Sequence, residues 1–370
     1  MKAQTELLVT MPVVNPRTGA KSKTFVFCGV VDRTDASRID DWKTGDPGRF
    51  ISKARIGFQA ELYALAVEGS QGRVIREVTY RLMDRPTLKY SQPVFSYAVK
   101  KTGRKTALKL FDNRKQAETL ANMQNGYVEE RVKGDATRQD YEDRCYAWLL
   151  EDPARMVHHP HLLSEPRRQR ARQWLWESCK RLLECKNCDR WLPNELACYS
   201  WERACPYLPL CECEAQGGDV NWIIEDQYET ADPHPELGEV VNGGKTVVTY
   251  SSLTTHALCE QKYYWKVVRC LRPHRDDAEA RWVGSAMHAG VAAYANGGLE
   301  AACKAIDEWA NYNPVLGPDA AWKQEEQVAK ARAMVRAAAV KWPDVKPVAP
   351  EPEPVEDEPK ELPTGEAIPF

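Results

Sequence analysis

Two short β-prone segments separated by a few turn residues constrain the fold of this chain more than any other feature. Phe25 to Arg33 is rich in β-branched and aromatic residues, and Arg38 to Thr44 is a second β-prone run. The residues between them, Thr34 to Ser37, have the composition of a tight turn. The sequence therefore predicts an antiparallel β-hairpin near the N-terminus.

The predicted hairpin brings three charged side chains together. If its turn is centred on Ala36 and Ser37, Asp32 lies directly opposite Asp41, and the Cβ atoms of opposed residues are about 4.5–5.5 Å apart. Lys43 follows Asp41 by two residues and points to the same face of the strand. This arrangement depends on the register, because a slip of one residue would separate the side chains.

Two carboxylates this close repel each other and shift each other's protonation unless a cation lies between them. Oxygen ligands at this density suit Mg²⁺ or Mn²⁺. Such an ion lowers the pKa of water and offsets the charge that builds up on a phosphate. Lys43 would position the attacking water or neutralise the phosphate. Taken alone, the D-x-K pattern fits an ordinary ion pair on a surface hairpin at least as well.

The segment after the hairpin adds a helical motif. Residues 51–68 have helical periodicity, and Gln59 and Tyr63, four residues apart, lie on one helix face. Together GVVD, DDWKTG and FQAELYALA resemble the RecB-type branch of the PD-(D/E)XK nucleases. The resemblance implies an α/β fold with a restriction-endonuclease-like core, a mixed sheet flanked by helices. It also implies that Asp32 and Asp41 bind the metal.

The same resemblance implies catalytic roles for Lys43, Gln59 and Tyr63, the last two lining the DNA groove beside the metal. Glu6, in TELLVTMPV, loosely matches the acidic residue that the family carries before its hairpin.

The chain has twelve cysteines, which in a cytosolic protein are better explained by metal binding than by disulfides. Cys198, Cys205 and Cys211 lie in a loop-like, proline-interrupted stretch, and thiolates this close favour zinc or an iron–sulfur cluster. The stretch resembles the C-terminal cysteine segment of the iron–sulfur RecB-type exonucleases, a group that includes phage enzymes. The resemblance implies a 4Fe–4S cluster.

The fourth cluster ligand and a further metal ligand come from the other end of the chain. TYSSLTTHALCEQKYYWKVVRCLRP resembles the family's opening segment, which makes Cys259 the fourth thiolate. RWVGSAMHAGVAAY resembles the family's glycine-to-histidine motif, which places His288 at the catalytic metal, where a neutral imidazole can bind it directly. In the family, the segments with this cysteine and this histidine precede the hairpin and the other three cysteines, whereas in this chain they follow them.

A circular permutation whose two blocks form one domain explains the reversed order best, because each block alone lacks essential parts. A tandem array cut at both ends and a mis-framed gene are the alternatives. A zinc site is the alternative to the cluster and needs no permutation. It would use the thiolates of Cys185, Cys188, Cys198 and Cys205. Cys211 or Cys213 could replace one of these four.

The predicted organisation has four parts. Residues 1–215 form the nuclease core block with the hairpin and three cluster cysteines, and residues 216–247 form a linker. Residues 248–342 form a helical block that resembles the family's opening segment. Residues 343–370 are acidic and proline-rich, and we expect them to be disordered because they cannot bury enough apolar area.

Other segments carry weaker local signals. We expect a strand at residues 76–82, amphipathic helices at residues 116–150 and 165–183, and a surface loop at the HHPH run from His158. The basic runs that begin at Val99 and Arg167 would either contact phosphates or form solvated faces.

The hairpin predicts a site for Mg²⁺ or Mn²⁺, and the resemblance implies a metal-dependent deoxyribonuclease that hydrolyses phosphodiester bonds. It also implies an exonuclease-like role in phage or bacterial DNA processing or recombination. The expected partners are single-stranded DNA or duplex ends, with a recombination or replication protein. No segment approaches the roughly 18 apolar residues of a membrane helix, and the N-terminus does not read as a signal peptide, so a cytoplasmic location is expected. The alternatives are a catalytically inactive, nuclease-like module that binds DNA or a partner, and a zinc-stapled interaction protein.

Overall fold

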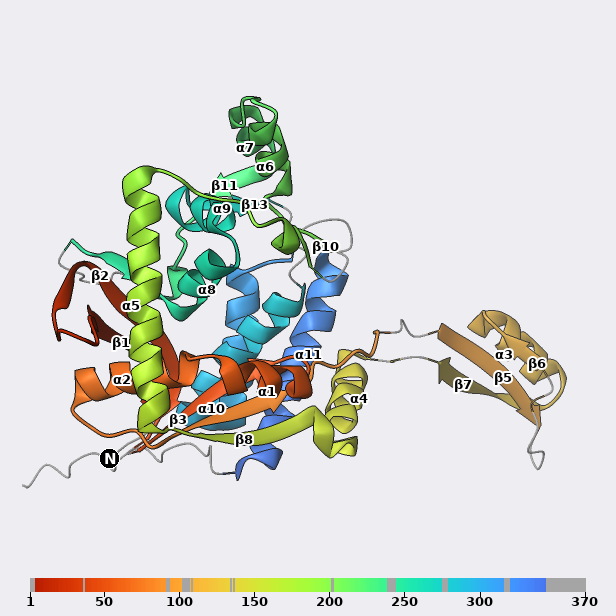
Figure 1. Ribbon diagram of the computed structural model, residues 1–370. Helices are drawn as coiled ribbons and strands as arrows, with labels where there is room; N and C mark the ends of the chain where they lie inside the picture. Colours follow the sequence, from red (N-terminus) through yellow and green to blue (C-terminus); the bar gives the residue numbers. More distant parts are fainter. Residues whose placement is uncertain are drawn as a thin grey trace, which may run out of the picture.

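The computed structural model describes residues 4–35, 37–90, 94–101, 107, 109–133, 135, 137–200, 203–237, 244–274, 279–315 and 320–343. A mixed six-stranded sheet flanked by helices forms its centre, as expected for the predicted fold class (Figure 1). Five strands follow the order β1-β2-β3-β4-β8, and the sixth, β12, pairs with β2. Their bounds are β1 Gln4–Val14, β2 Lys21–Thr34, β3 Arg38–Thr44, β4 Glu77–Met83, β8 Met156–Leu162 and β12 Thr246–Val248.

The strand β12 pairs a late segment of the chain with an early one. β12 runs parallel to β2 and pairs with Phe25, Val26 and Phe27. Because β1 occupies the other edge of β2, β12 and β3 share one edge. β3 pairs with β2 only at Arg33 and Thr34, so a gap in the described ladder separates the two partners at residues 28–32. Asp32 lies at the end of this gap.

Two groups of helices cover the sheet, and each is held by its own core. The first core packs β-strand residues such as Phe27 and Val31 against Leu62 of α2 and Leu175 of α5. The second packs Trp42 of β3 against the C-terminal helices. The helices concerned are α1 Pro47–Ile56, α2 Gln59–Gln71, α4 Arg138–Glu151, α5 Glu165–Cys188, α10 Glu279–Tyr312 and α11 Ala320–Lys341.

A third, smaller core holds the cysteine-rich region together. It packs Tyr207 and Leu210 against Trp265 and Leu271. The region contains short elements: the hairpin β9 Tyr199–Ser200 and β10 Arg203–Ala204, the helices α6 Leu208–Ala215, α7 Asn221–Gln227, α8 Tyr250–Leu258 and α9 Glu260–Tyr263, the π-helical turn Tyr264–Val268, and β11 Tyr228–Thr230 paired with β13 Leu271–Pro273. Single 3-10 turns lie at Pro153–Arg155, Glu195–Ala197 and Pro235–Leu237.

A separate three-stranded sheet projects from the body between β4 and α4 (Figure 1). Its strands β5 Val94–Lys101, β6 Lys109–Phe111 and β7 Gly126–Lys133 pack on α3 Arg114–Met123. The predicted helix over residues 116–150 is therefore wrong, since β7 divides it. Asn125 has a positive φ of 49°, and a Cβ on Gly126 would lie 2.6 Å from the Lys100 carbonyl oxygen. This turn and the close strand contact explain the interruption.

Three other local predictions also change. The helix predicted over residues 51–68 is divided into α1 and α2 at Gly57, whose backbone is extended (φ −71°, ψ 164°). The HHPH run is not a loop but part of β8, where Pro160 is compatible with an edge strand. The predicted linker contains α7 and β11. The predicted disordered tail lies, from residue 344 on, outside the described residues.

The second basic run stabilises the fold. Arg167 forms an ion pair with Glu61 of α2, and the Arg168 Nη1 atom lies 2.6 Å from Glu68 Oε2 of the same helix. These contacts hold α5 against α2. The first basic run, from Val99, lies largely outside the described residues. No described helix has the length and apolarity that a membrane span requires.

Candidate active site

The hairpin adopts the predicted register. Arg33 pairs with Asp40 and Thr34 pairs with Ile39, so the next position along the two strands brings Asp32 beside Asp41. The Asp32 Oδ2 atom accepts a hydrogen bond from the Trp42 backbone N–H at 2.7 Å. This bond holds the Asp32 side chain against β3 at the point where the regular ladder ends.

Lys43 completes the group of charges on the hairpin. Its Nζ atom donates a hydrogen bond to Asp41 Oδ1 at 2.7 Å. The Asp41 side chain is only 3% exposed, whereas Lys43 is partly exposed. A buried carboxylate therefore lies beneath an ammonium group that reaches solvent.

His288 comes to the same place from the other end of the chain. It lies on α10, and its Nδ1 atom is 3.6 Å from Asp32 Oδ1. The His288 side chain is 32% exposed. Four of the residues singled out from the sequence thus converge: Asp32, Asp41, Lys43 and His288.

A glycine one helical turn before His288 allows this approach. A Cβ on Gly284 would lie 2.8 Å from Thr44 Oγ1 at the end of β3. Atoms do not pack that closely, so a larger residue here would force Thr44 or α10 to move. The glycine of the glycine-to-histidine motif therefore has a packing role, because it allows the helix that carries His288 to approach β3.

We expect Gly284→Ala to lower catalytic activity by about 10- to 100-fold with little loss of stability, because a shift of about 1 Å in a catalytic group can cost this much. Alanine is the better helix former, so propensity does not predict unfolding. Activity and thermal unfolding would be measured together. Gly69→Ala, in α2 where a Cβ meets nothing within 4 Å, is the matched control. The double variant with Thr44→Ala should recover activity, and failure to recover would contradict the packing explanation.

The charges at the site shift one another's pKa values. Burial by itself would raise the pKa of Asp32, but His288 and Lys43 outweigh it and lower the pKa to about 2. Burial raises the pKa of Asp41 to about 6, with Asp32 adding to the effect and Lys43 opposing it. Burial would lower the pKa of Lys43, but the two aspartates raise it instead. Asp32 raises the pKa of His288 against the effect of burial.

Gln59 and Tyr63 of α2 lie beside these charges. The Gln59 side chain hydrogen-bonds Tyr63, whose pKa burial raises to about 12. Tyr63 lies over Gly29 of β2, where an added Cβ would be 2.7 Å from its Cε1 atom. The glycine of the GVVD motif therefore makes room for this ring. Glu6, the loosest match, is exposed on β1 with a positive φ of 49°.

The donor set fits a divalent cation. Asp41 Oδ2 is buried and has no hydrogen-bond partner among the described residues. A buried carboxylate oxygen without a partner is unfavourable unless a cation binds it. Asp32, Asp41 and His288 supply oxygen and nitrogen ligands that suit Mg²⁺ or Mn²⁺.

Sequence reasoning missed the buried layer that supports the hairpin. Asp40, next to Asp41, lies on the opposite side of β3 and is buried between Arg33 and Arg81, with the Arg81 Nη2 atom 3.0 Å from its Oδ1. Arg81 also lies over the Trp42 ring, 5.6 Å from its centroid. The doubled aspartate in DDWK was the available signal, but Arg81 is distant in sequence and could not be paired with it.

The four cysteines assigned to a cluster gather in the cysteine-rich region. The Cys205 N–H donates to the Cys198 carbonyl at 2.6 Å, Cys211 lies on α6, and Cys259 precedes α9. Burial raises the pKa of Cys211 to about 11, and Cys205, Cys259 and Cys198 add to the effect. The thiols are thus close enough to interact electrostatically.

Their spacing is wider than one zinc ion requires. Bond lengths of about 2.3 Å place the sulfurs of a zinc tetrahedron about 3.8 Å apart. Among the described residues, no group of three or more potential ligands within 4.8 Å of one another includes Cys198, Cys205 or Cys211. Cys188 is exposed at the end of α5.

Comparison with known proteins identifies one family. A sequence model of the PD-(D/E)XK nuclease superfamily matches residues 3–212 and 247–365. The first segment contains Asp32, Asp41 and Lys43, and the second contains His288. Searches of curated proteins and of solved structures found no significant match.

Proposed function

The chain belongs to the PD-(D/E)XK nuclease superfamily, and on that basis we propose that it is a Mg²⁺- or Mn²⁺-dependent deoxyribonuclease. One observation carries this proposal. Asp32, Asp41 and Lys43 lie on one hairpin near the start of the chain, and His288 reaches the same place from a helix far along the chain. A purely structural ion pair on the hairpin would not require the histidine.

The roles of the residues follow from their contacts. Asp32, Asp41 and His288 would hold the cation, which when bound lowers the pKa of water and offsets charge on the phosphate. The Lys43 ammonium would orient the attacking water, or stabilise the negative charge that develops on the phosphate. Because its pKa is raised, Lys43 stays protonated at neutral pH and acts through its charge.

Gln59 and Tyr63 would position the substrate. Both lie on α2 beside the carboxylates, and the Tyr63 hydroxyl stays protonated near neutral pH because burial raises its pKa. A protonated hydroxyl and an amide can donate hydrogen bonds to phosphate oxygens. We propose single-stranded DNA or duplex ends as the substrate and an exonuclease-like mode of cleavage, in phage or bacterial DNA processing with a recombination or replication protein as partner.

We also propose that Cys198, Cys205, Cys211 and Cys259 bind a 4Fe–4S cluster. Three of these ligands precede residue 216 and the fourth follows residue 247, so the cluster would fasten the two blocks of a permuted domain to each other. Its role would be structural.

Cleavage of end-labelled single- and double-stranded DNA tests the proposed activity. With Mg²⁺ or Mn²⁺ the wild-type protein should cut, and Lys43→Ala should cut about 10²- to 10³-fold more slowly. Lys304→Ala, an exposed lysine at the other end of α10, is the control and should cut like the wild type. Equal cutting by wild type and Lys43→Ala would mean that the site is elsewhere. Metal-independent DNA binding without any cutting would instead favour an inactive, DNA-binding module.

A further inference from the structure

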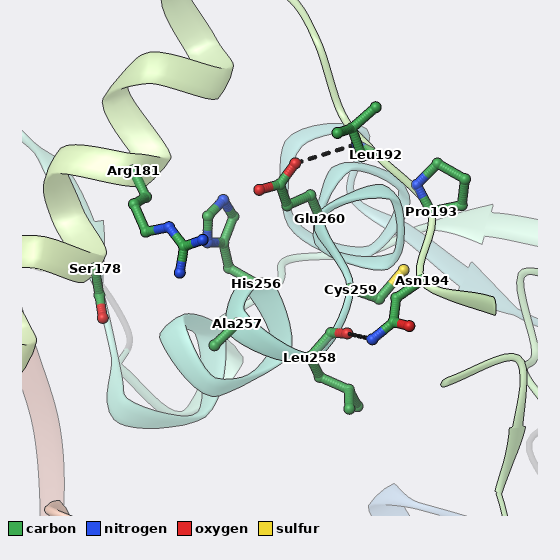
Figure 2. A pocket seen from close by; sticks show the side chains of 10 residues that line it. All are labelled: Ser178, Arg181, Leu192, Pro193, Asn194, His256, Ala257, Leu258, Cys259 and Glu260. Carbon is green, nitrogen blue, oxygen red and sulfur yellow. Dashed lines mark hydrogen bonds between the residues drawn. The ribbon is translucent and has the colours of Figure 1, made fainter. Parts of the chain in front are cut away.

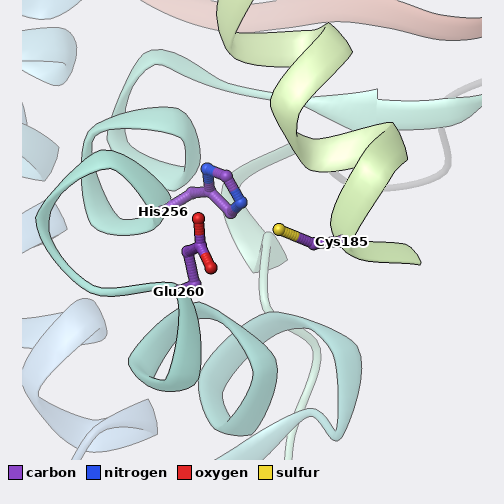
Figure 3. Close-up of side chains that lie close together, drawn as sticks. All are labelled: Cys185, His256 and Glu260. Atoms are coloured by element: carbon purple, nitrogen blue, oxygen red, sulfur yellow. The ribbon is translucent and has the colours of Figure 1, made fainter. Parts of the chain in front are cut away.

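Three further potential metal ligands converge where the two halves of the chain meet. Cys185 lies in the last turn of α5, His256 in the last turn of α8, and Glu260 at the start of α9. One ligand atom from each side chain lies within 4.8 Å of the other two. Figure 3 shows the three side chains pointing toward one another from separate elements. None of them belongs to the proposed catalytic site or to the four cluster cysteines.

His256 is the strongest indication that this group binds something. The residue is 4% exposed, and its Nε2 atom is buried without a hydrogen-bond partner among the described residues. A buried ring nitrogen without a partner is unfavourable, and a bound cation would satisfy it. Burial also lowers the pKa of His256, which favours the neutral imidazole that can donate its lone pair to a metal.

The neighbouring groups orient Glu260 and affect the protonation of Cys185. Glu260 Oε2 accepts a hydrogen bond from the Leu192 backbone N–H at 3.2 Å, which fixes the direction of the carboxylate (Figure 2). Burial raises the pKa of the Cys185 thiol to about 11, and the nearby Glu260 carboxylate adds to this shift. The thiol therefore keeps its proton until a cation displaces it, and binding would release that proton to solvent.

We propose that Cys185, His256 and Glu260 bind a zinc ion. Sulfur, imidazole nitrogen and carboxylate oxygen are all established zinc ligands, with bond lengths of about 2.0–2.3 Å. Ligand atoms around such an ion lie about 3.3–3.8 Å apart, so small rotations of the side chains suffice to close the site from its present spacing.

A water molecule can provide the fourth ligand. A cavity of about 200 Å³ opens beside His256 and Glu260, and its wall includes Arg181 and Asn194 (Figure 2). Three protein ligands and one solvent position form a common zinc geometry.

The position of the site indicates which elements the ion would hold together. Cys185 comes from the long helix α5 in the first part of the chain. His256 and Glu260 come from α8 and α9, the first helices of the second part. A zinc ion here would hold α8 and α9 against the end of α5, and with them the segment that carries Cys259. This inference does not depend on nuclease activity.

Metal analysis of the full-length protein tests the proposal. After loading with Zn²⁺ and removal of the excess, the wild type should retain a zinc ion that His256→Gln and Cys185→Ser do not. Cys188→Ser, three residues further along the same helix, is the control and should retain zinc, because the exposed Cys188 is outside the group. Cys198→Ser should also retain it, which separates this site from the cysteine cluster.

Co²⁺ provides a second measurement. It should give a thiolate-to-cobalt charge-transfer band in the wild type and in Cys188→Ser, and no such band in Cys185→Ser. Circular dichroism identifies any variant that fails to fold. If Cys185→Ser does not fold, the zinc content of His256→Gln, which keeps the thiol, tests the proposal. The proposal is overturned if the wild type retains no zinc, if His256→Gln retains as much as the wild type, or if Cys198→Ser alone loses it.

Discussion

Asp41→Asn is expected to reduce the rate of DNA cleavage by about 10³-fold or more and to leave the fold intact. Asparagine has the same shape as aspartate but lacks the charge that a cation and Lys43 both require. Asp41 Oδ2 has no partner among the described residues, so the substitution breaks no protein contact at that atom. Removal of the charge from a carboxyl group whose pKa burial already raises to about 6 should not destabilise the protein.

The comparison is single-turnover cleavage by the variant and the wild type at saturating Mg²⁺, with thermal unfolding measured in parallel. The matched control is Asp226→Asn, which should cut normally. Asp226 is exposed on α7, and this helix lies well away from β3 (Figure 1). If Asp41→Asn keeps more than about a tenth of the activity, Asp41 is not a ligand of the catalytic cation.

Trp42→Ala is expected to lower the free energy of unfolding by about 3–5 kcal/mol. Trp42 is 1% exposed, and its ring meets Trp342 edge-on at 5.1 Å between centroids. It belongs to the core that joins β3 to α10 and α11. A loss of this size is a large part of the roughly 5–15 kcal/mol that stabilises most proteins, so activity should fall as well.

Urea unfolding followed by circular dichroism measures this effect. Trp222→Ala, with a side chain that is 61% exposed on α7, is the control and should change the stability by less than about 1 kcal/mol. If the two variants lose equal stability, the packing between the hairpin and the C-terminal helices does not stabilise the fold as described.

The hairpin could be predicted from the sequence because its geometry is local. A short turn and two β-prone runs fix the register, and the register alone brings Asp32 beside Asp41. His288 could be assigned only by resemblance to a family. Its approach to Asp32 depends on the contact between Gly284 and Thr44, two residues far apart in the chain.

Contacts between distant segments explain what could not be predicted from the sequence. The ion pair of Asp40 with Arg81 and the grouping of Cys185 with His256 depend on how strands and helices pack, which no local pattern records. The interruption at Gly126 likewise reflects the pairing of β7 with β5, a tertiary contact that overrides the helical periodicity of the segment.

Segments from the two ends of the chain meet at the central sheet. β12 adds to the same edge of β2 as β3, and α10 lies against β3 through Gly284. The part of the chain that follows residue 245 therefore contributes both a strand of the central sheet and a side chain beside Asp32. We propose that residues from both ends of the chain form one metal site.

Binding of Mn²⁺ to the full-length protein, measured by the paramagnetic signal of the free ion, tests that claim most directly. His288→Ala should weaken Mn²⁺ binding by about 10-fold or more, since it removes a ligand and the partner of Asp32. His274→Ala, an exposed histidine, should bind like the wild type. If His288→Ala binds Mn²⁺ as tightly as the wild type, the C-terminal helix does not complete the site on the N-terminal hairpin.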